Sequence, residues 1–173
     1  MKLIPILFIV FTITAYGQES PMPIRPLDTL TINEAAFIGL VKMNEIGDNM
    51  IIGGIIHSFK INKMLDEQVV FLLENGRLAF NSDDVYLVFA KDQPGKRFSI
   101  DKRSRILKQD DSEKDIAYLL SLLPCFDPDL KELDEGCAHR GGWFVCGCDS
   151  NTYSSPCEAL KNGIVIFQKG KCK

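Results

Sequence analysis

Apolar residues between positions 37 and 100 fall into short stretches, and their spacing predicts a series of β-strands. The stretches are Phe37–Val41, Ile55–Ile61, Val69–Leu73, Val85–Ala90 and Arg97–Ile100. In Ile55–Ile61 polar residues alternate with apolar ones, which is typical of a half-buried strand. Val85–Ala90 is apolar throughout, so we expect a central strand that is buried on both faces.

A helical period replaces the strand pattern after residue 111. Asp111 or Ser112 is the expected N-cap, and Pro124 ends the helix. One apolar stripe is expected on it, formed by Ile116, Leu119, Leu120 and Leu123. About five strands followed by a helix predict an α+β unit over residues 31–124, with a small β-barrel against which the helix packs. This segment contains no cysteine, and we expect it to fold as a unit of its own.

Residues 1–17 have the pattern of a secretory signal peptide. Lys2 supplies the positive start, Leu3–Ala15 is apolar, and Ala15-Tyr16-Gly17 is a small-x-small cleavage site. The apolar stretch is too short for a permanent membrane span. We therefore expect an exported protein, extracellular or periplasmic, with no membrane segment after cleavage.

The next segment, residues 18–30, contains Pro21, Pro23 and Pro26 without a hydrophobic period, and we interpret it as a linker. The whole chain has a net charge of −3, which becomes −4 when Lys2 leaves with the signal peptide. This mild acidity argues against nucleic acid and anionic membranes as partners.

All six cysteines lie in the last quarter of the chain, at positions 125, 137, 146, 148, 157 and 172. A segment of this length buries too little apolar surface to hold a fold unaided, and disulfides usually stabilise such segments in exported proteins. Six cysteines allow 15 pairings. Cys146 and Cys148 are too close to bridge each other, and spacing decides nothing more. A zinc site built from these two cysteines and His139 is the alternative use, which an oxidising compartment disfavours.

The segment 125–173 resembles a Kazal domain, the small serine-protease-inhibitor module. The resemblance rests on Val145–Tyr153, which reads Val-Cys-Gly-x-Asp-x-x-Thr-Tyr, on the ten residues between Cys146 and Cys157, and on a closing Gly-x-Cys. Ala159 and Leu160 stand where the family usually has a helix cysteine. Cys148 is additional, as in the subtype that reads Cys-Gly-Cys-Asp. The resemblance implies three disulfides: Cys125–Cys148, Cys137–Cys157 and Cys146–Cys172.

The expected fold of this segment is a three-stranded sheet with a short helix. Ser155 is the expected N-cap, with Pro156 at the first helical position, Glu158 in a capping box and Gly163 at the end. The expected strands are Trp143–Cys146, Thr152–Tyr153 and Ile164–Phe167.

A protease recognises a Kazal inhibitor by the loop between the inhibitor's second and third cysteines. The corresponding candidate inhibitory residues here are Ala138, His139, Arg140, Gly141 and Gly142. Counting forward from Cys137 places the specificity residue at His139, whereas counting back from Cys146 places it at Arg140. We favour Arg140, because the expected Val-Cys-Gly strand anchors the third-cysteine side of the loop. An arginine suits a pocket with a buried carboxylate.

By this resemblance the expected partner is a serine protease of trypsin-like or subtilisin-like type, and Tyr153 and Ser155 would support the loop. Ser155 replaces the Asn that braces the loop carbonyls in good inhibitors, and Gly141-Gly142 adds backbone freedom after the expected reactive bond. The alternative function is a non-inhibitory extracellular binding module in which the Kazal domain is only structural.

The preceding unit is similar to a netrin-like domain, the OB-type barrel of tissue inhibitors of metalloproteinases. The similarity rests on Ala36–Val41, Phe59–Ile61, Tyr86–Ala90 and Arg103–Arg105, followed by the helix. Those inhibitors chelate the protease zinc through an N-terminal cysteine. The mature chain is expected to begin at Gln18, so metalloprotease inhibition through an N-terminal cysteine is not predicted. The sequence does not indicate a partner for the barrel.

Residues suited to catalysis are few. His57 lies in a strand-like run and is interpreted as a core or surface residue, and its neighbour Ser58 does not make a triad. The pairs Asp83-Asp84 and Asp110-Asp111 lie at expected element boundaries, as turns and caps. We therefore expect no enzyme, no metal and no cofactor.

Overall fold

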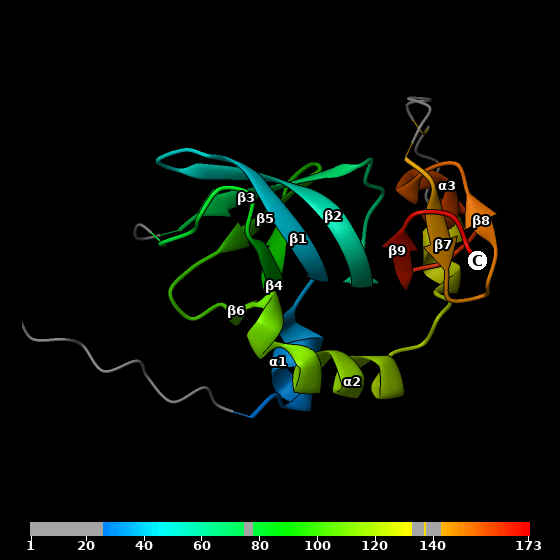
Figure 1. Cartoon of the computed structure of the whole chain (residues 1–173), viewed down its shortest axis with the longest axis horizontal. Coiled ribbons are helices and arrows are strands. Elements are labelled where there is room, and N and C mark those ends of the chain that lie inside the picture. The colour runs from blue at the N-terminus through cyan, green and yellow to red at the C-terminus, as the bar shows by residue number, and fades with distance from the viewer. Residues whose placement is uncertain (1–25, 75–77, 133–136, 138–142) are drawn as a thin grey trace, which may run out of the picture.

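Five strands form where the apolar stretches predict them, and they close into a barrel. They are β1 (Phe37–Ile46), β2 (Met50–Ile61), β3 (Gln68–Leu73), β4 (Val85–Gln93) and β5 (Arg97–Ile100). The computed structural model describes residues 26–74, 78–132, 137 and 143–173, with the barrel on one side and the disulfide-rich unit on the other (Figure 1). The expected signal peptide and most of the expected linker lie outside the described residues.

The barrel closes through the order β1-β2-β3-β5-β4, because β4 returns to pair with β1. All these pairs are antiparallel except β3 with β5, which run parallel. Along β1 and β2 the register shifts several times, which bends the two long strands around the barrel. Gly53 lies inside this bend, where an added Cβ would clash with the Val41 side chain.

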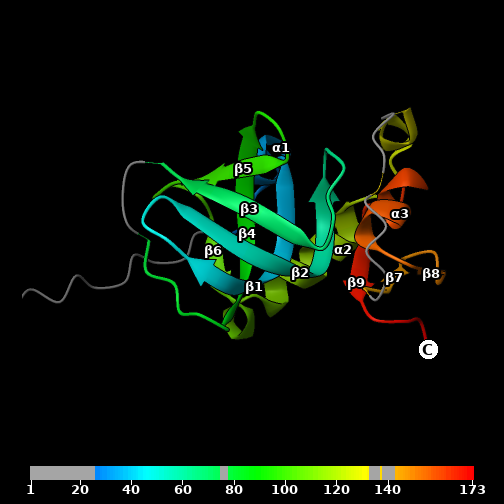
Figure 2. The ribbon, with the colours of Figure 1, turned by 90° about the horizontal axis from the view of Figure 1, so that it is seen from above.

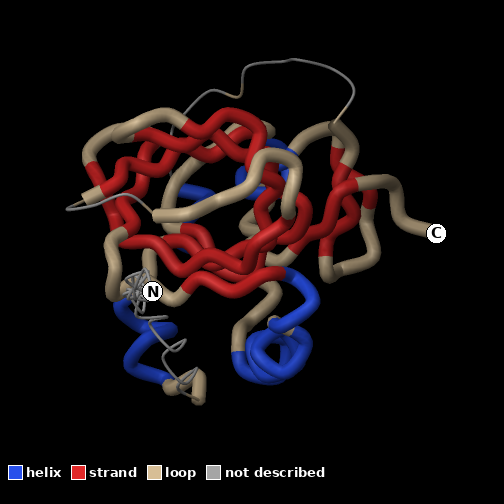
Figure 3. The backbone as a smooth tube through the Cα atoms, turned by 60° about the vertical axis from the view of Figure 1, so that its left-hand side comes forward, coloured by secondary structure: helices blue, strands red, loops and turns tan. Residues whose placement is uncertain are grey.

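Strand β4 is apolar on both faces because both faces are covered. Val88 belongs to the buried cluster inside the barrel. Its neighbours Leu87 and Phe89 belong to a second buried cluster, with Ile32 and Leu119. These last two residues come from the helices α1 (Thr29–Glu34) and α2 (Glu113–Leu122), which lie against one side of the barrel (Figure 3). The prediction of a strand buried on both faces is thus confirmed.

Helix α2 is confirmed, but its predicted stripe is wrong at one position. Leu119 is fully buried, whereas Leu120 is 49% exposed. The apolar surface that α2 turns towards the barrel is narrow, because Asp115, which is also buried, occupies part of it. The Asp115 carboxylate accepts a hydrogen bond from Arg105 at 2.6 Å. Ser112 precedes the helix, but its hydroxyl donates to the Gln109 carbonyl at 2.7 Å and accepts no capping hydrogen bond from a helix N–H.

Several short elements were not predicted. Helix α1 begins inside the expected linker, where the Asp28 carboxylate accepts a hydrogen bond from the Thr31 N–H at 2.7 Å. Strand β6 (Ile106–Lys108) pairs with β4, and a 3₁₀ turn, η1 (Gln109–Asp111), leads into α2. The aspartate pairs lie at element boundaries as expected, with Asp83 in a turn at a φ of 71°.

The disulfide-rich unit consists of a small sheet and a two-turn helix. Its elements are η2 (Pro128–Glu132), β7 (Val145–Gly147), β8 (Thr152–Tyr153), α3 (Pro156–Lys161) and β9 (Phe167–Lys169). The strands pair antiparallel in the order β8-β7-β9. The last strand begins three residues later than predicted, because Ile164 makes an isolated bridge with Phe126 and the Val165 N–H donates to the Cys125 carbonyl.

The small sheet joins the barrel edge to edge. Strand β9 pairs with the second half of β2, where Ser58 lies opposite Phe167 and His57 opposite Gln168. Figure 2 shows β9 beside β2 at this seam. One cluster of buried apolar residues also runs from Phe71 in the barrel to Phe167 in β9. The expected boundary at residue 124 therefore separates the cysteine-free and cysteine-rich segments, but the sheet and the core continue across it.

Candidate functional site

Three disulfides hold the C-terminal unit together. They join Cys125 to Cys148, Cys137 to Cys157 and Cys146 to Cys172, which are the pairs that the Kazal resemblance implies. No cysteine is free. The alternative zinc site is therefore wrong, because sulfurs in disulfides are not thiolate ligands. Three disulfides are typical of secreted or extracellular proteins.

The candidate inhibitory residues 138–142 lie outside the described residues, but both ends of this segment can be placed. Its first end is Cys137, which is bonded to Cys157 in the first turn of α3, where Cys157 is 1% exposed. At its second end, the Phe144 carbonyl accepts a hydrogen bond from the Gly170 N–H at 2.7 Å. Strand β7 then continues between β8 and β9. A disulfide fixes one end and a sheet fixes the other.

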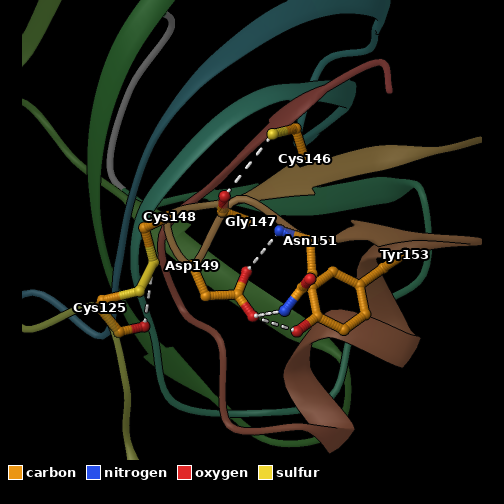
Figure 4. The surroundings of a disulfide bond; sticks show 7 residues. All are labelled: Cys125, Cys146, Gly147, Cys148, Asp149, Asn151 and Tyr153. Carbon is orange, nitrogen blue, oxygen red and sulfur yellow. Dashed lines mark hydrogen bonds between the residues drawn. A yellow bond between two sulfur atoms is a disulfide. The ribbon is translucent and has the colours of Figure 1, made fainter. Parts of the chain in front are cut away.

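A turn centred on Asp149 connects β7 to β8 (Figure 4). The carboxylate of Asp149 accepts hydrogen bonds from the Tyr153 hydroxyl at 2.7 Å and from the Asn151 side-chain amide at 2.8 Å. It also accepts one from the Asn151 backbone N–H at 3.1 Å. Ser150 takes a φ of 63°, as the turn requires. The Asp and Tyr of the motif thus brace the hairpin that carries β7.

The side chains of Asp149 and Tyr153 shift each other's pKa. Partial burial acts to raise the pKa of Asp149, but the hydrogen bonds from Tyr153 and Asn151 outweigh it and hold that pKa below its usual value. Burial, together with the hydrogen bond to Asp149, raises the pKa of Tyr153 to about 12. The pair therefore keeps one charge and one proton across the physiological pH range.

Helix α3 begins as the sequence predicts. The Ser155 hydroxyl accepts a hydrogen bond from the Glu158 N–H at 3.1 Å, and Pro156 occupies the first helical turn. The Glu158 carboxylate accepts from the Ser154 N–H, one residue before the N-cap. The helix ends before Gly163, whose φ of 78° favours glycine. Ser155 therefore fixes α3, to which the first end of the candidate loop is bonded.

Two lysines lie over the aromatic residues that follow the loop, a feature that the sequence analysis did not identify. Lys169 Nζ is 3.9 Å from the Trp143 ring centroid, and Lys171 Nζ is 4.3 Å from the Phe144 ring centroid. These distances are typical of cation–π interactions. The only signal in the sequence was the spacing of Lys169 and Lys171 near the end of the chain. This spacing did not indicate which aromatic rings the two lysines would cover.

His57 and Ser58, the pair considered for catalysis, belong to the seam. The His57 ring stacks on Phe59 with centroids 4.3 Å apart, and burial lowers its pKa to about 4. Ser58 is fully buried, and its hydroxyl has no hydrogen-bond partner among the described residues. The two side chains therefore make no hydrogen-bonded pair in which His57 could activate the Ser58 hydroxyl.

Metal sites and membrane-spanning helices are two further features to consider in the part of the chain that the structure describes. Within residues 26–74, 78–132, 137 and 143–173, no group of three or more His, Cys, Asp or Glu side chains is placed to hold a metal ion. In the same ranges no helix has both the length and the apolar composition needed to cross a membrane. No protein-family model matches the chain, and no curated protein or solved structure matches it.

Proposed function

We propose that the C-terminal unit is a Kazal-type inhibitor of serine proteases, which presents residues 138–142 as a substrate-like loop. The observation that carries the proposal is the fixation of both loop ends: Cys137 is bonded to α3, and the Phe144 carbonyl is held by the N–H of Gly170, the residue after β9. Such an inhibitor binds tightly because the loop has little conformational freedom left to lose in the complex. The Cys-Gly-Cys-Asp motif, with its Asp149–Tyr153 hydrogen bond, adds to this support.

Arg140 is the proposed specificity residue. Its guanidinium would enter a pocket with a carboxylate at its base, so the target belongs to the trypsin-like proteases or to subtilisin-like proteases that accept arginine. A desolvated, bidentate arginine–carboxylate pair is among the strongest single anchors of an interface. His139 is the competing assignment, and the two make opposite predictions for single substitutions.

We propose further that the barrel is of the OB type. Its five strands close in the order β1-β2-β3-β5-β4 with a parallel β3–β5 pair, which is compatible with the partly open Greek-key barrel of that fold. The barrel supports the inhibitory unit through β2, which pairs with β9, which in turn pairs with β7. The rigidity of the second loop end would then depend on the barrel as well as on the disulfides.

The test is a titration of trypsin with the mature protein and with two single variants. Arg140→Ala should weaken binding by roughly 2–5 kcal/mol, because the pocket carboxylate is left buried and unpaired. His139→Ala is the matched control and should change the inhibition constant by less than about tenfold, equivalent to 1.4 kcal/mol. A reversed order of the two effects would move the specificity residue to His139. No inhibition by the unsubstituted protein would refute the proposal for this protease class.

A further inference from the structure

Two aromatic rings that precede β7 form a cluster with two lysines at the end of β9 and just after it. We call Trp143, Phe144, Lys169 and Lys171 the aromatic–lysine surface. Each lysine covers one ring, at 3.9 Å for Trp143 and 4.3 Å for Phe144. The surface stays accessible in the chain, since Phe144 is 38% exposed and both lysines are exposed.

The positive charge of this surface is not neutralised within the part of the protein that the structure describes. Ion pairs there involve other lysines and arginines, and none includes Lys169 or Lys171. The cation–π contacts orient the two ammonium groups without cancelling their charge. Two oriented cations without carboxylate partners are suited to bind carboxylates of another molecule.

The place of the surface in the chain indicates which molecule this would be. Trp143 and Phe144 follow directly after residue 142, and the Gly170 N–H holds the Phe144 carbonyl at 2.7 Å. Since a substrate-like loop lies in the protease cleft in an extended form, the residues after its reactive bond face the protease on the leaving-group side. Rings and lysines fixed at this position would meet that side of the enzyme.

We infer that the aromatic–lysine surface recognises an acidic region of the target protease, next to the cleft on the leaving-group side. This inference rests on the proposed function of the loop, but it concerns partner selection. In this division of roles, Lys169 and Lys171 attract the protease, whereas Arg140 fills the specificity pocket of the protease. Charges at the rim of an interface act mainly on the association rate and on its salt dependence.

The experiment compares association with anionic and cationic trypsins, by stopped-flow inhibition at low and physiological salt. The unsubstituted protein should associate faster with anionic trypsin, and the difference should shrink as salt is added. The double variant K169Q/K171Q should associate with anionic trypsin roughly three- to tenfold more slowly at low salt. Its dissociation rate should change little. The variant K102Q/K114Q, which removes two exposed lysines of the barrel unit, is the charge-matched control.

The outcomes separate this inference from the proposed function. Inhibition of both trypsins with equal association rates for the unsubstituted protein and K169Q/K171Q would overturn the inference and leave the inhibitor in place. An equal loss in K102Q/K114Q would also overturn it, because net charge alone would then account for the effect. Inhibition of neither trypsin would overturn both. Slower association confined to K169Q/K171Q and anionic trypsin supports the inference.

Discussion

The seam between the barrel and the disulfide-rich unit gives the most direct prediction about stability. Phe167 is 2% exposed, lies opposite Ser58 across the β2–β9 pair, and belongs to the cluster that continues into the barrel. Removal of its ring in Phe167→Ala should therefore destabilise the protein by about 3–5 kcal/mol, the usual effect for a buried phenylalanine. For a protein of this size, that corresponds to a decrease in Tm of roughly 6–20 °C.

Two probes can follow the two halves of the protein separately. The chain has a single tryptophan, Trp143, which lies in the disulfide-rich unit, so its fluorescence reports on that unit. Far-UV circular dichroism reports mainly on the barrel strands. Urea unfolding should be followed by both probes under oxidising conditions, which keep the disulfides intact. Phe167→Leu is the conservative control and should change the unfolding free energy by less than about 1.5 kcal/mol.

A shared core requires the two transitions to move together. We expect coincident urea midpoints for both probes in the unsubstituted protein, and a common shift in Phe167→Ala. A shift confined to the Trp143 signal would contradict a core shared by the two units. It would mean that the barrel does not depend on the seam, in agreement with the sequence-based expectation that residues 31–124 fold as a unit of their own.

Two further predictions concern single side chains. Burial lowers the pKa of His57 from 6.5 to about 4, so the unfolded chain binds a proton more readily and stability should fall as the pH drops from 6.5 towards 4. His57→Gln should remove up to about 3 kcal/mol of this pH dependence, measured by urea unfolding at several pH values. Gly163→Ala should lower the Tm by several degrees, because the backbone has a φ of 78° and the added Cβ would clash with the Phe126 ring. An unchanged melting curve would contradict that contact.

The strands were predictable because the burial of their faces leaves a regular pattern of apolar residues in the sequence. Tyr86–Ala90 is buried throughout, and an unbroken apolar run is what such a strand requires. The disulfide pairs were implied by the resemblance to a Kazal domain, whereas the spacing of the cysteines alone excluded only a Cys146–Cys148 pair. By contrast, α1 has only six residues and follows prolines, and it is held by the Asp28 cap and by the burial of Ile32. Such tertiary support has no period to detect.

Other differences come from packing that a single segment does not reveal. Leu120 belongs to the helical stripe by spacing, but the barrel covers only a narrow side of α2, where the Arg105–Asp115 pair also lies. The segment Ile164–Ile166 is strand-like in composition because it is buried, although pairing with β7 starts only at Phe167. The seam joins strands more than a hundred residues apart, so neither partner's local sequence specifies it.

Substrate-like inhibition can be followed in the loop itself while the protein is in contact with a protease. The mature protein is incubated overnight with a small amount of trypsin, while residual trypsin activity and the intact mass are measured in parallel. The proposed substrate-like inhibition should be stoichiometric and should leave the Arg140–Gly141 bond largely intact, since a fixed loop is bound tightly and cleaved slowly. Slow cleavage after Arg140 alongside inhibition still agrees with it, because Gly141-Gly142 adds freedom there. Rapid cleavage at this bond with no loss of trypsin activity would contradict it.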